Sequence, residues 1–403
     1  MPPPPDEFVQ PPPAAPSGRR RLAVAVALLA VVVAAAAGGR YRVTRPDYRL
    51  ARGELAVRAG DARSAGGYAD RLEASGHADH AHLLRGEALL AFDSPALALA
   101  EFNLIDPDSP LRLKAANLSG RCLLDLGETR EALRVYQFVV AQRPDDADGH
   151  RGLAAVAYDL GQLGEAVGHL RRVAELDAAD ARPHRLVGLI YKDMAQDDAA
   201  EVAYREALRR GLPAEAEGDV RLELAEVLAR QTKFADALDA LAAGKPAWGS
   251  ESERAAVQAE CLRGLGRSRE AADLLDGALA RAPTATLYRL RGQAHQDAEQ
   301  LPEALKCFER AAEAGPQDHQ AQYLLGLSYS AAGRKAEAAR CFARVEELKA
   351  NLDRVTALTQ EAMAKPWDAA VRTRLAALWD AMDKPKLAEM WRKAAASCGD
   401  AKP

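Results

Sequence analysis

An alanine recurs along this chain at steps of 33 to 37 residues, and residues at fixed distances from it recur in step. The series has nine members: Ala65, Ala98, Ala132, Ala166, Ala200, Ala237, Ala271, Ala304 and Ala338. Twelve residues before each alanine stands Gly or Ala, and four residues after it stands Phe, Tyr or Leu, except for Ala69 in the first unit. A unit of this length is too short to bury a core alone, so neighbouring units must stack. The period therefore predicts an array of similar units rather than one globular core.

The unit is clearest in residues 319–342. In order, its marker residues are Leu325, Gly326, Tyr329, Gly333, Ala338 and Phe342. This spacing resembles the tetratricopeptide repeat (TPR), a helix-turn-helix unit of 34 residues. The resemblance implies an all-α fold, a solenoid that winds as a right-handed superhelix of about nine to ten repeats. Small residues are expected where the two helices of a unit cross, with the large residue packed beside them.

The repeat pattern divides the chain into four segments. Residues 1–18 carry eight prolines and are expected to form a disordered tail. Residues 19–40 are predicted to form a transmembrane helix, and residues 46–352 a solenoid of about nine repeats. Residues 353–398 are expected to form a linker helix and a C-terminal capping unit, because they recover the pattern only in part.

The uncharged run 22–39 follows three arginines and would span about 27 Å as a helix, close to the thickness of a membrane core. A retained single-pass anchor is the favoured interpretation. A signal peptide cleaved after Ala37 and a buried helix of a soluble protein are the alternatives. The arginines after the run favour repeats in the cytoplasm. A single N-terminal anchor before a large domain favours export, and we expect the repeats to be extracytoplasmic.

Catalytic and cofactor motifs are absent from the sequence. It contains no Gly-rich phosphate loop, no GxSxG and no HExxH, so neither enzymatic activity nor a cofactor is expected. The net charge of −4 gives no reason to expect nucleic acid as a partner. The cluster His77, Asp79, His80 and His82 could hold a metal ion. A polar turn between repeats is the favoured reading, because His82 shares its repeat position with two other histidines, and no metal is expected.

The concave side of the solenoid is the predicted binding surface. In the resembled family, positions 2, 5, 9 and 12 of the first helix line this groove, and they share one helix face. The third to fifth units place mostly basic residues there, whereas the units after Gly211 place acidic ones. The candidate peptide-binding residues are Lys114, Asn117, Arg121, Arg151, Arg182 and Arg185. They predict a protein or peptide partner with an acidic segment. The alternative is a solvated face without a ligand.

These features predict a non-catalytic, membrane-anchored scaffold that binds proteins or peptides. The alternative is a targeting or regulatory subunit of an enzyme complex whose catalytic chain is separate. A carbohydrate-binding solenoid is less favoured, because the groove positions contain few aromatic residues, chiefly Tyr158 and Tyr323. The sequence carries no signal for the oligomeric state.

Overall fold

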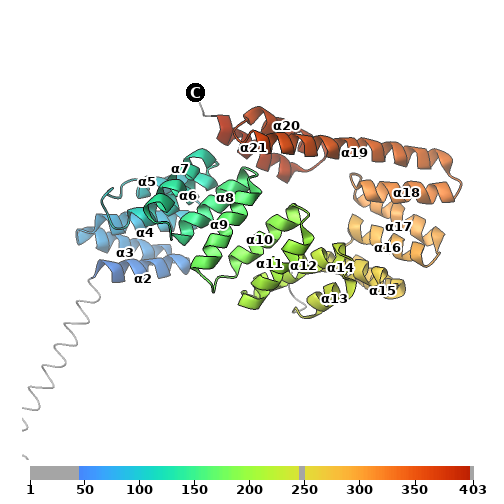
Figure 1. Cartoon of the computed structure of the whole chain (residues 1–403), viewed down its shortest axis with the longest axis horizontal. Helices are drawn as coiled ribbons and strands as arrows, with labels where there is room; N and C mark the ends of the chain where they lie inside the picture. The colour runs from blue at the N-terminus through green and yellow to red at the C-terminus, as the bar shows by residue number, and fades with distance from the viewer. Residues whose placement is uncertain (1–44, 245–249, 400–403) are drawn as a thin grey trace, which may run out of the picture. The chain divides into compact units, whose positions relative to one another are not determined.

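A computed structural model describes residues 45–244 and 250–399, and every regular element among them is a helix (Figure 1). The helices are α2 (Pro46–Arg58), α3 (Ala62–Ala74), α4 (Ala78–Ala91), α5 (Pro95–Phe102), α6 (Arg112–Asp125), α7 (Thr129–Gln142), α8 (Ala147–Asp159), α9 (Leu163–Leu176), α10 (Arg182–Asp193), α11 (Asp197–Arg210), α12 (Ala214–Arg230), α13 (Phe234–Ala242), α14 (Glu251–Gly264), α15 (Ser268–Arg281), α16 (Ala285–Asp297), α17 (Leu301–Ala314), α18 (His319–Ala331), α19 (Lys335–Ala364), α20 (Ala369–Ala381) and α21 (Pro385–Gly399). The prediction of an all-α repeat solenoid is confirmed.

The chain divides into two compact units, Met1–Ala115 and Ala116–Pro403, and the boundary falls within α6. In the second unit, successive helices from α7 to α21 contact one another in chain order. Each even-numbered helix and the odd-numbered helix after it form one repeat, called here helix A and helix B. The ninth repeat contains α19, a continuous helix of 30 residues that runs past residue 352, and α20 and α21 form a further pair.

The alanine series lies in the contact between helix A and helix B, as predicted. Ala200 is fully buried, and the other eight members are at most 4% exposed. The glycine twelve residues earlier faces the large residue. A Cβ atom built on Gly188 would lie only 2.7 Å from the ring of Tyr204. The same arrangement joins four further pairs: Gly86 with Phe102, Gly120 with Tyr136, Gly292 with Phe308, and Gly326 with Phe342. Glycine is thus needed where an aromatic ring crosses the helix backbone.

Each turn from helix A to helix B contains one residue in the left-handed backbone region. Five turns use glycine: Gly60, Gly127, Gly161, Gly266 and Gly333. The other five use Asp93, Ala195, Thr232, Glu299 and Asp383, with φ between 54° and 60°. Because all ten described turns contain a residue with positive φ, the helix-turn-helix unit keeps its geometry where another residue stands in place of glycine.

The predicted fold class needs one correction, which concerns the transmembrane helix. None of the helices in residues 45–244 and 250–399 is long and apolar enough to cross a membrane. The longest, α19, has sufficient length, but charged side chains recur along it from Lys335 to Glu361. The predicted span 22–39 and the proline-rich tail 1–18 lie outside the described residues. The described residues therefore form an all-α repeat solenoid in which no helix is able to cross a membrane.

Candidate functional site

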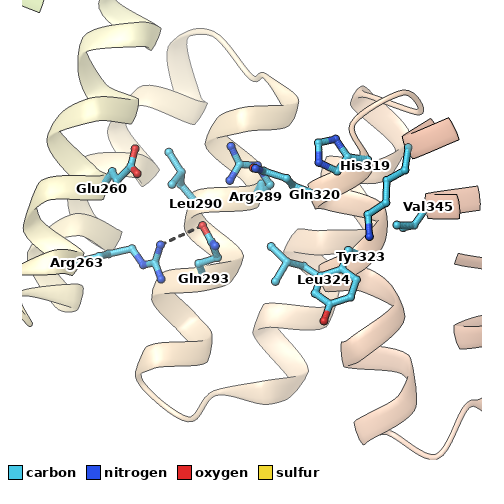
Figure 2. A pocket seen from close by; sticks show the side chains of 11 residues that line it. Glu260, Arg263, Arg289, Leu290, Gln293, His319, Gln320, Tyr323, Leu324 and Val345 are labelled. Carbon is cyan, nitrogen blue, oxygen red and sulfur yellow. Dashed lines mark hydrogen bonds between the residues drawn. The ribbon is translucent and has the colours of Figure 1, made fainter. Parts of the chain in front are cut away.

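A pocket of about 480 Å³ opens along consecutive A helices near the C-terminal end of the repeats (Figure 2). It is built by α14, α16, α18 and the first half of α19. Its lining residues are Glu260, Arg263, Arg289, Leu290, Gln293, His319, Gln320, Tyr323, Leu324, Val345 and Lys349. The three A helices supply nine of these residues, because stacked repeats bring equivalent helix faces side by side.

The apolar part of the pocket combines buried and accessible side chains. Leu290 and Val345 are buried, at 4% and 2% exposure, and Leu324 is partly buried. Tyr323 remains 45% exposed, and its ring centroid lies 6.0 Å from that of Phe342. An accessible aromatic ring beside buried aliphatic residues offers contact area to an apolar side chain of a ligand.

Arg263 is already engaged within the protein. It donates hydrogen bonds through Nε and Nη2 to the carboxylate of Asp297, at 2.7 and 3.2 Å. Its Nη1 donates to Oε1 of Gln293 at 3.0 Å, the bond drawn in Figure 2. This fork between α14 and α16 neutralises the guanidinium and fixes its position. Arg263 therefore shapes one wall of the pocket rather than supplying a free charge.

Arg289 retains a donor that the protein does not satisfy. Its buried Nε forms no hydrogen bond among the described residues and lies 3.4 Å from Oδ2 of Asp318. The other oxygen of Asp318 accepts hydrogen bonds from the backbone N–H groups of Gln320 and Ala321 at the start of α18. Asp318 thus interacts with the N-terminus of α18 through one oxygen and with Arg289 through the other. Arg289 therefore lines the pocket with its Nε held in a long ion pair to Asp318.

A second cation stands at the α19 side of the pocket. The ammonium of Lys349 lies 3.9 Å from Glu346, and both side chains are more than half exposed. An ion pair between such exposed side chains is weak, so the ammonium group of Lys349 is available to bind an anionic group of a ligand. Together, Arg289 and Lys349 place donors beside an apolar slot. This suits recognition of an extended segment that carries an apolar side chain and an acidic one.

The sequence-predicted basic residues lie elsewhere, and most of them pair within the protein. In the first unit, Lys114 contacts Glu54 and Glu87 at 2.6 and 2.7 Å. In the second unit, Asn117 donates to Oδ1 of Asp146 at 2.8 Å. These side chains join one helix to another, so they have a structural role in addition to the predicted binding role.

Arg151 and Arg182 converge on one carboxylate, that of Asp180. Arg182 donates to both of its oxygens, at 2.8 and 2.9 Å, and Arg151 donates to Oδ2 at 3.0 Å. The hydrogen bonds from Arg182, followed by that from Arg151, lower the pKa of Asp180 to about 2 although its burial acts in the opposite direction. Asp180 therefore binds two of the predicted ligand-binding residues and links α8 to α10.

Arg185 explains why the groove positions change from basic to acidic near Gly211. Its guanidinium donates to Glu223 at 2.8 Å and to Asp219 at 3.4 Å, both on α12. Lys192, on the same helix as Arg185, contacts Glu226. The basic face of α10 therefore complements the acidic face of α12. Among the six predicted residues, the side chains of Arg182 and Arg121 are the most exposed, at 71% and 65%, and that of Arg121 lies 4.0 Å from Asp125.

The groove positions themselves identify much of the pocket. Glu260, Arg263 and Tyr323 occupy positions that the sequence analysis assigned to the concave face, and Arg289 and Gln293 occupy the same positions in the eighth unit. The basic charge of the third to fifth units favoured those units instead, so these residues were not among the predicted ligand-binding candidates. Opposite charges separated by 34 to 38 residues were the signal that the basic side chains of α10 already have partners.

The histidines considered as metal ligands do not converge. Nδ1 of His82 lies 2.8 Å from Oε2 of Glu101, whereas Nε2 of His80 lies 3.7 Å from Asp47. No group of three or more possible ligands comes together in the part of the chain that the structure describes. These contacts join helices of the first unit.

Comparison with known proteins finds matches to one repeat family in two parts of the chain. Residues 123–190 and 289–352 each match a family model described as tetratricopeptide repeat. No curated protein matches the chain. A tetratricopeptide repeat protein from Parabacteroides merdae is 17% identical, with a TM-score of 0.43 over 62% of this chain and 98% of that one. YrrB, described as a TPR protein with an unusual peptide-binding site, is 18% identical, with a TM-score of 0.30 over 53% of this chain and 91% of its own. Pseudomonas aeruginosa pilF is also 18% identical, with a TM-score of 0.43 over 56% and 98%. These likenesses are too distant to transfer a ligand.

Proposed function

Because the chain contains tetratricopeptide repeats, we propose that it is a non-catalytic scaffold that binds a segment of a partner protein in the pocket of α14, α16, α18 and α19. The observation that carries the proposal is the accessible ring of Tyr323 beside buried aliphatic side chains, in a pocket that Arg289 and Lys349 also line.

The proposed ligand is an extended peptide with a bulky apolar residue next to Asp or Glu. The apolar side chain would contact Tyr323 and Leu324, and the carboxylate would lie between Arg289 and Lys349. Exposed ion pairs each contribute about 0–1 kcal/mol, so the apolar contact supplies most of the affinity. Binding should therefore persist in moderate salt and weaken only in part.

The basic strip of Lys114, Asn117, Arg121, Arg151, Arg182 and Arg185 is a second candidate for an acidic segment. The exposure of Arg121 favours it. A ligand at Arg151, Arg182 or Arg185 must compete with carboxylates that are already in place, which lowers the gain from each new contact. A role as a targeting or regulatory subunit of an enzyme complex uses the same kind of binding, and co-purification of a catalytic chain would distinguish it.

Binding can be tested with an array of twelve-residue peptides and the full-length chain. One Leu and one Glu are moved independently along a Gly-Ser background, and Lys replaces Glu in a parallel set. We expect capture of peptides with adjacent Leu and Glu, and poor capture of the Lys set. Equal capture of both sets would refute the assigned ligand chemistry.

Two matched pairs of variants locate the site. Tyr323→Ala should weaken capture at least tenfold, whereas Tyr158→Ala, which removes a tyrosine of similar exposure (47%) from α8, should not. Lys349→Glu should weaken capture of the Glu peptides, whereas Lys335→Glu, at the exposed start of α19, should leave it unchanged. If the Tyr158 variant lost capture instead, the site would move towards the basic strip.

A further inference from the structure

The last helix of the second unit returns to its first repeat. Helix α21 contacts α7, although more than 240 residues separate the two helices in the chain. Since each helix from α7 to α21 also contacts its neighbour in sequence, the series of contacts within this unit closes on itself. We propose that residues 363–393 form a reversible clasp on the helix turns of the third and fourth repeats, and that α19 couples this clasp to the pocket.

The clasp contains a cation–π contact. The guanidinium carbon of Arg130, on α7, lies 4.6 Å from the centroid of a Trp367 ring in the link between α19 and α20. This distance is within the range for attraction between a cation and an aromatic face. Both residues are partly accessible, so the contact is weak enough to break without unfolding a repeat.

Two turn glycines receive the remaining contacts. At Gly161 a Cβ atom would come within 2.6 Å of Cγ of Met363, so Met363 packs directly on the backbone of the α8–α9 turn. At Gly127, in the α6–α7 turn, a Cβ would lie 3.8 Å from the carbonyl oxygen of Lys393. Both glycines also have a positive φ that the turn needs. The turns that reverse the chain therefore leave room for the returning segment.

Helix α19 connects the clasp to the pocket. Its first half carries Val345 and Lys349, which line the pocket, and its last turn carries Met363. At 1.5 Å per residue, the 14 residues from Lys349 to Met363 span about 21 Å. The helix is continuous over this length, so a displacement at one end is transmitted to the other. When the clasp is closed, both ends of α19 are held in place. When the clasp opens, the C-terminal end of α19 becomes free to move.

The contact surface is small, because α7 and α21 meet over few residues compared with neighbouring helices. An interface of this kind exchanges between closed and open states. Any ligand that prefers one position of α19 must shift the clasp, and the clasp must shift ligand affinity by the same factor. This last consequence rests on the proposed function, whereas the clasp and its coupling to α19 do not.

The clasp is tested without a ligand by ¹⁹F NMR of the full-length chain labelled with fluorotryptophan. The four tryptophans should give separate signals, and the signal that disappears in the Trp367→Phe variant is that of Trp367. Arg130→Ala should shift the Trp367 signal. Arg134→Ala, one turn further along α7 and paired with Glu131, should leave it in place. Equal Trp367 signals in wild type and Arg130→Ala would overturn the clasp.

A second pair of variants tests opening and coupling. Met363→Glu places a charge against the Gly161 turn and should populate an open-state Trp367 signal, whereas Met390→Glu, at an exposed site on α21, should not. Backbone hydrogen exchange of residues 345–352 should accelerate severalfold in Met363→Glu relative to Met390→Glu. Unchanged exchange there, with the Trp367 signal altered, would overturn the coupling while keeping the clasp. Failure of the peptide array would affect neither result.

Discussion

Five of the ten described helix-A-to-helix-B turns hold a residue other than glycine in the left-handed backbone region. Thr232 is the least suited of them, with φ of 60° and a branched Cβ. For an L-residue this region costs about 1–2 kcal/mol relative to the right-handed one, and branching adds to the crowding. The α12–α13 turn is therefore strained at a position where the next repeat uses Gly266.

Thr232→Gly should raise the free energy of unfolding by about 0.5–1 kcal/mol. The relief of left-handed strain exceeds the extra entropy that glycine gives the unfolded chain. Urea unfolding followed by circular dichroism measures the change. The matched exchange, Gly266→Thr at the equivalent turn of the next repeat, should lower the unfolding midpoint. A Thr232→Gly variant no more stable than wild type would show that the turn relaxes around threonine.

Gly188→Ala should destabilise the protein by about 1–3 kcal/mol, because the added methyl would overlap the ring of Tyr204. Other repeats show the compensation: where Ala replaces this glycine, at Ala154, Ala225 and Ala259, the facing residue is Leu instead of an aromatic. Combining Gly188→Ala with Tyr204→Leu should therefore cost less than the sum of the two single changes. Additive thermal shifts in the double variant would contradict the contact.

At the scale of helices, neighbouring repeats are joined by buried or half-buried carboxylates. Asp180 receives Arg151 from α8 and Arg182 from α10, and its pKa falls to about 2. A carboxylate whose pKa is lower in the folded state stabilises the fold above its unfolded pKa, near 3.8. That stabilisation disappears as the pH falls from about 4 towards 2.

Asp180→Asn should lower the free energy of unfolding by about 2 kcal/mol at pH 7, since each pKa unit corresponds to about 1.4 kcal/mol. The difference between variant and wild type should shrink between pH 4 and pH 2, where Asp180 of the wild type becomes protonated. Thermal unfolding of both proteins across this range gives the measurement. Asp177→Asn, in the same turn before α10, serves as a control and should show a smaller effect. A difference that did not change with pH would assign the loss to packing.

The sequence predicted helices and their register well because its signal was local and repeated. Ala200 and its equivalents are buried in the predicted contact, and Gly188 faces Tyr204. The charged groove was harder to interpret. Whether Arg185 is free depends on Asp219 and Glu223 in the next repeat, and thus on how the helices stack. The length of α19 was also missed, because neither glycine nor proline marks where a repeat ends near residue 352.

Across the whole molecule, the five cysteines report on global folding. None forms a disulfide, and all except the partly buried Cys307 are buried. Burial raises the pKa of Cys122 and that of Cys261 to about 11. Because the thiolate is the reactive form, both the low access and the raised pKa slow modification.

At pH 8 the native chain should therefore react slowly with Ellman's reagent, with Cys307 the first to react, and all five thiols should react in guanidinium chloride. Mass spectrometry after a short pulse identifies the modified residues. Cys307→Ser should remove the early phase, whereas Cys341→Ser, at the same repeat position but buried, should leave it. Rapid reaction of several thiols in the native chain would mean that the repeats open locally on that time scale.

The ion pairs between repeats have a consequence for assembly of the chain. All repeats present similar small-residue seams, so packing alone would let a helix dock on the wrong neighbour during folding. The charges distinguish these alternatives: Arg151 meets Asp180, Arg185 meets Glu223, and Arg263 meets Asp297, each at its own place along the seam. A repeat that skipped a position would leave these side chains desolvated without their partners. The ion pairs thus favour the correct order of packing among repeats of similar shape, and they do so during folding, before any partner protein binds.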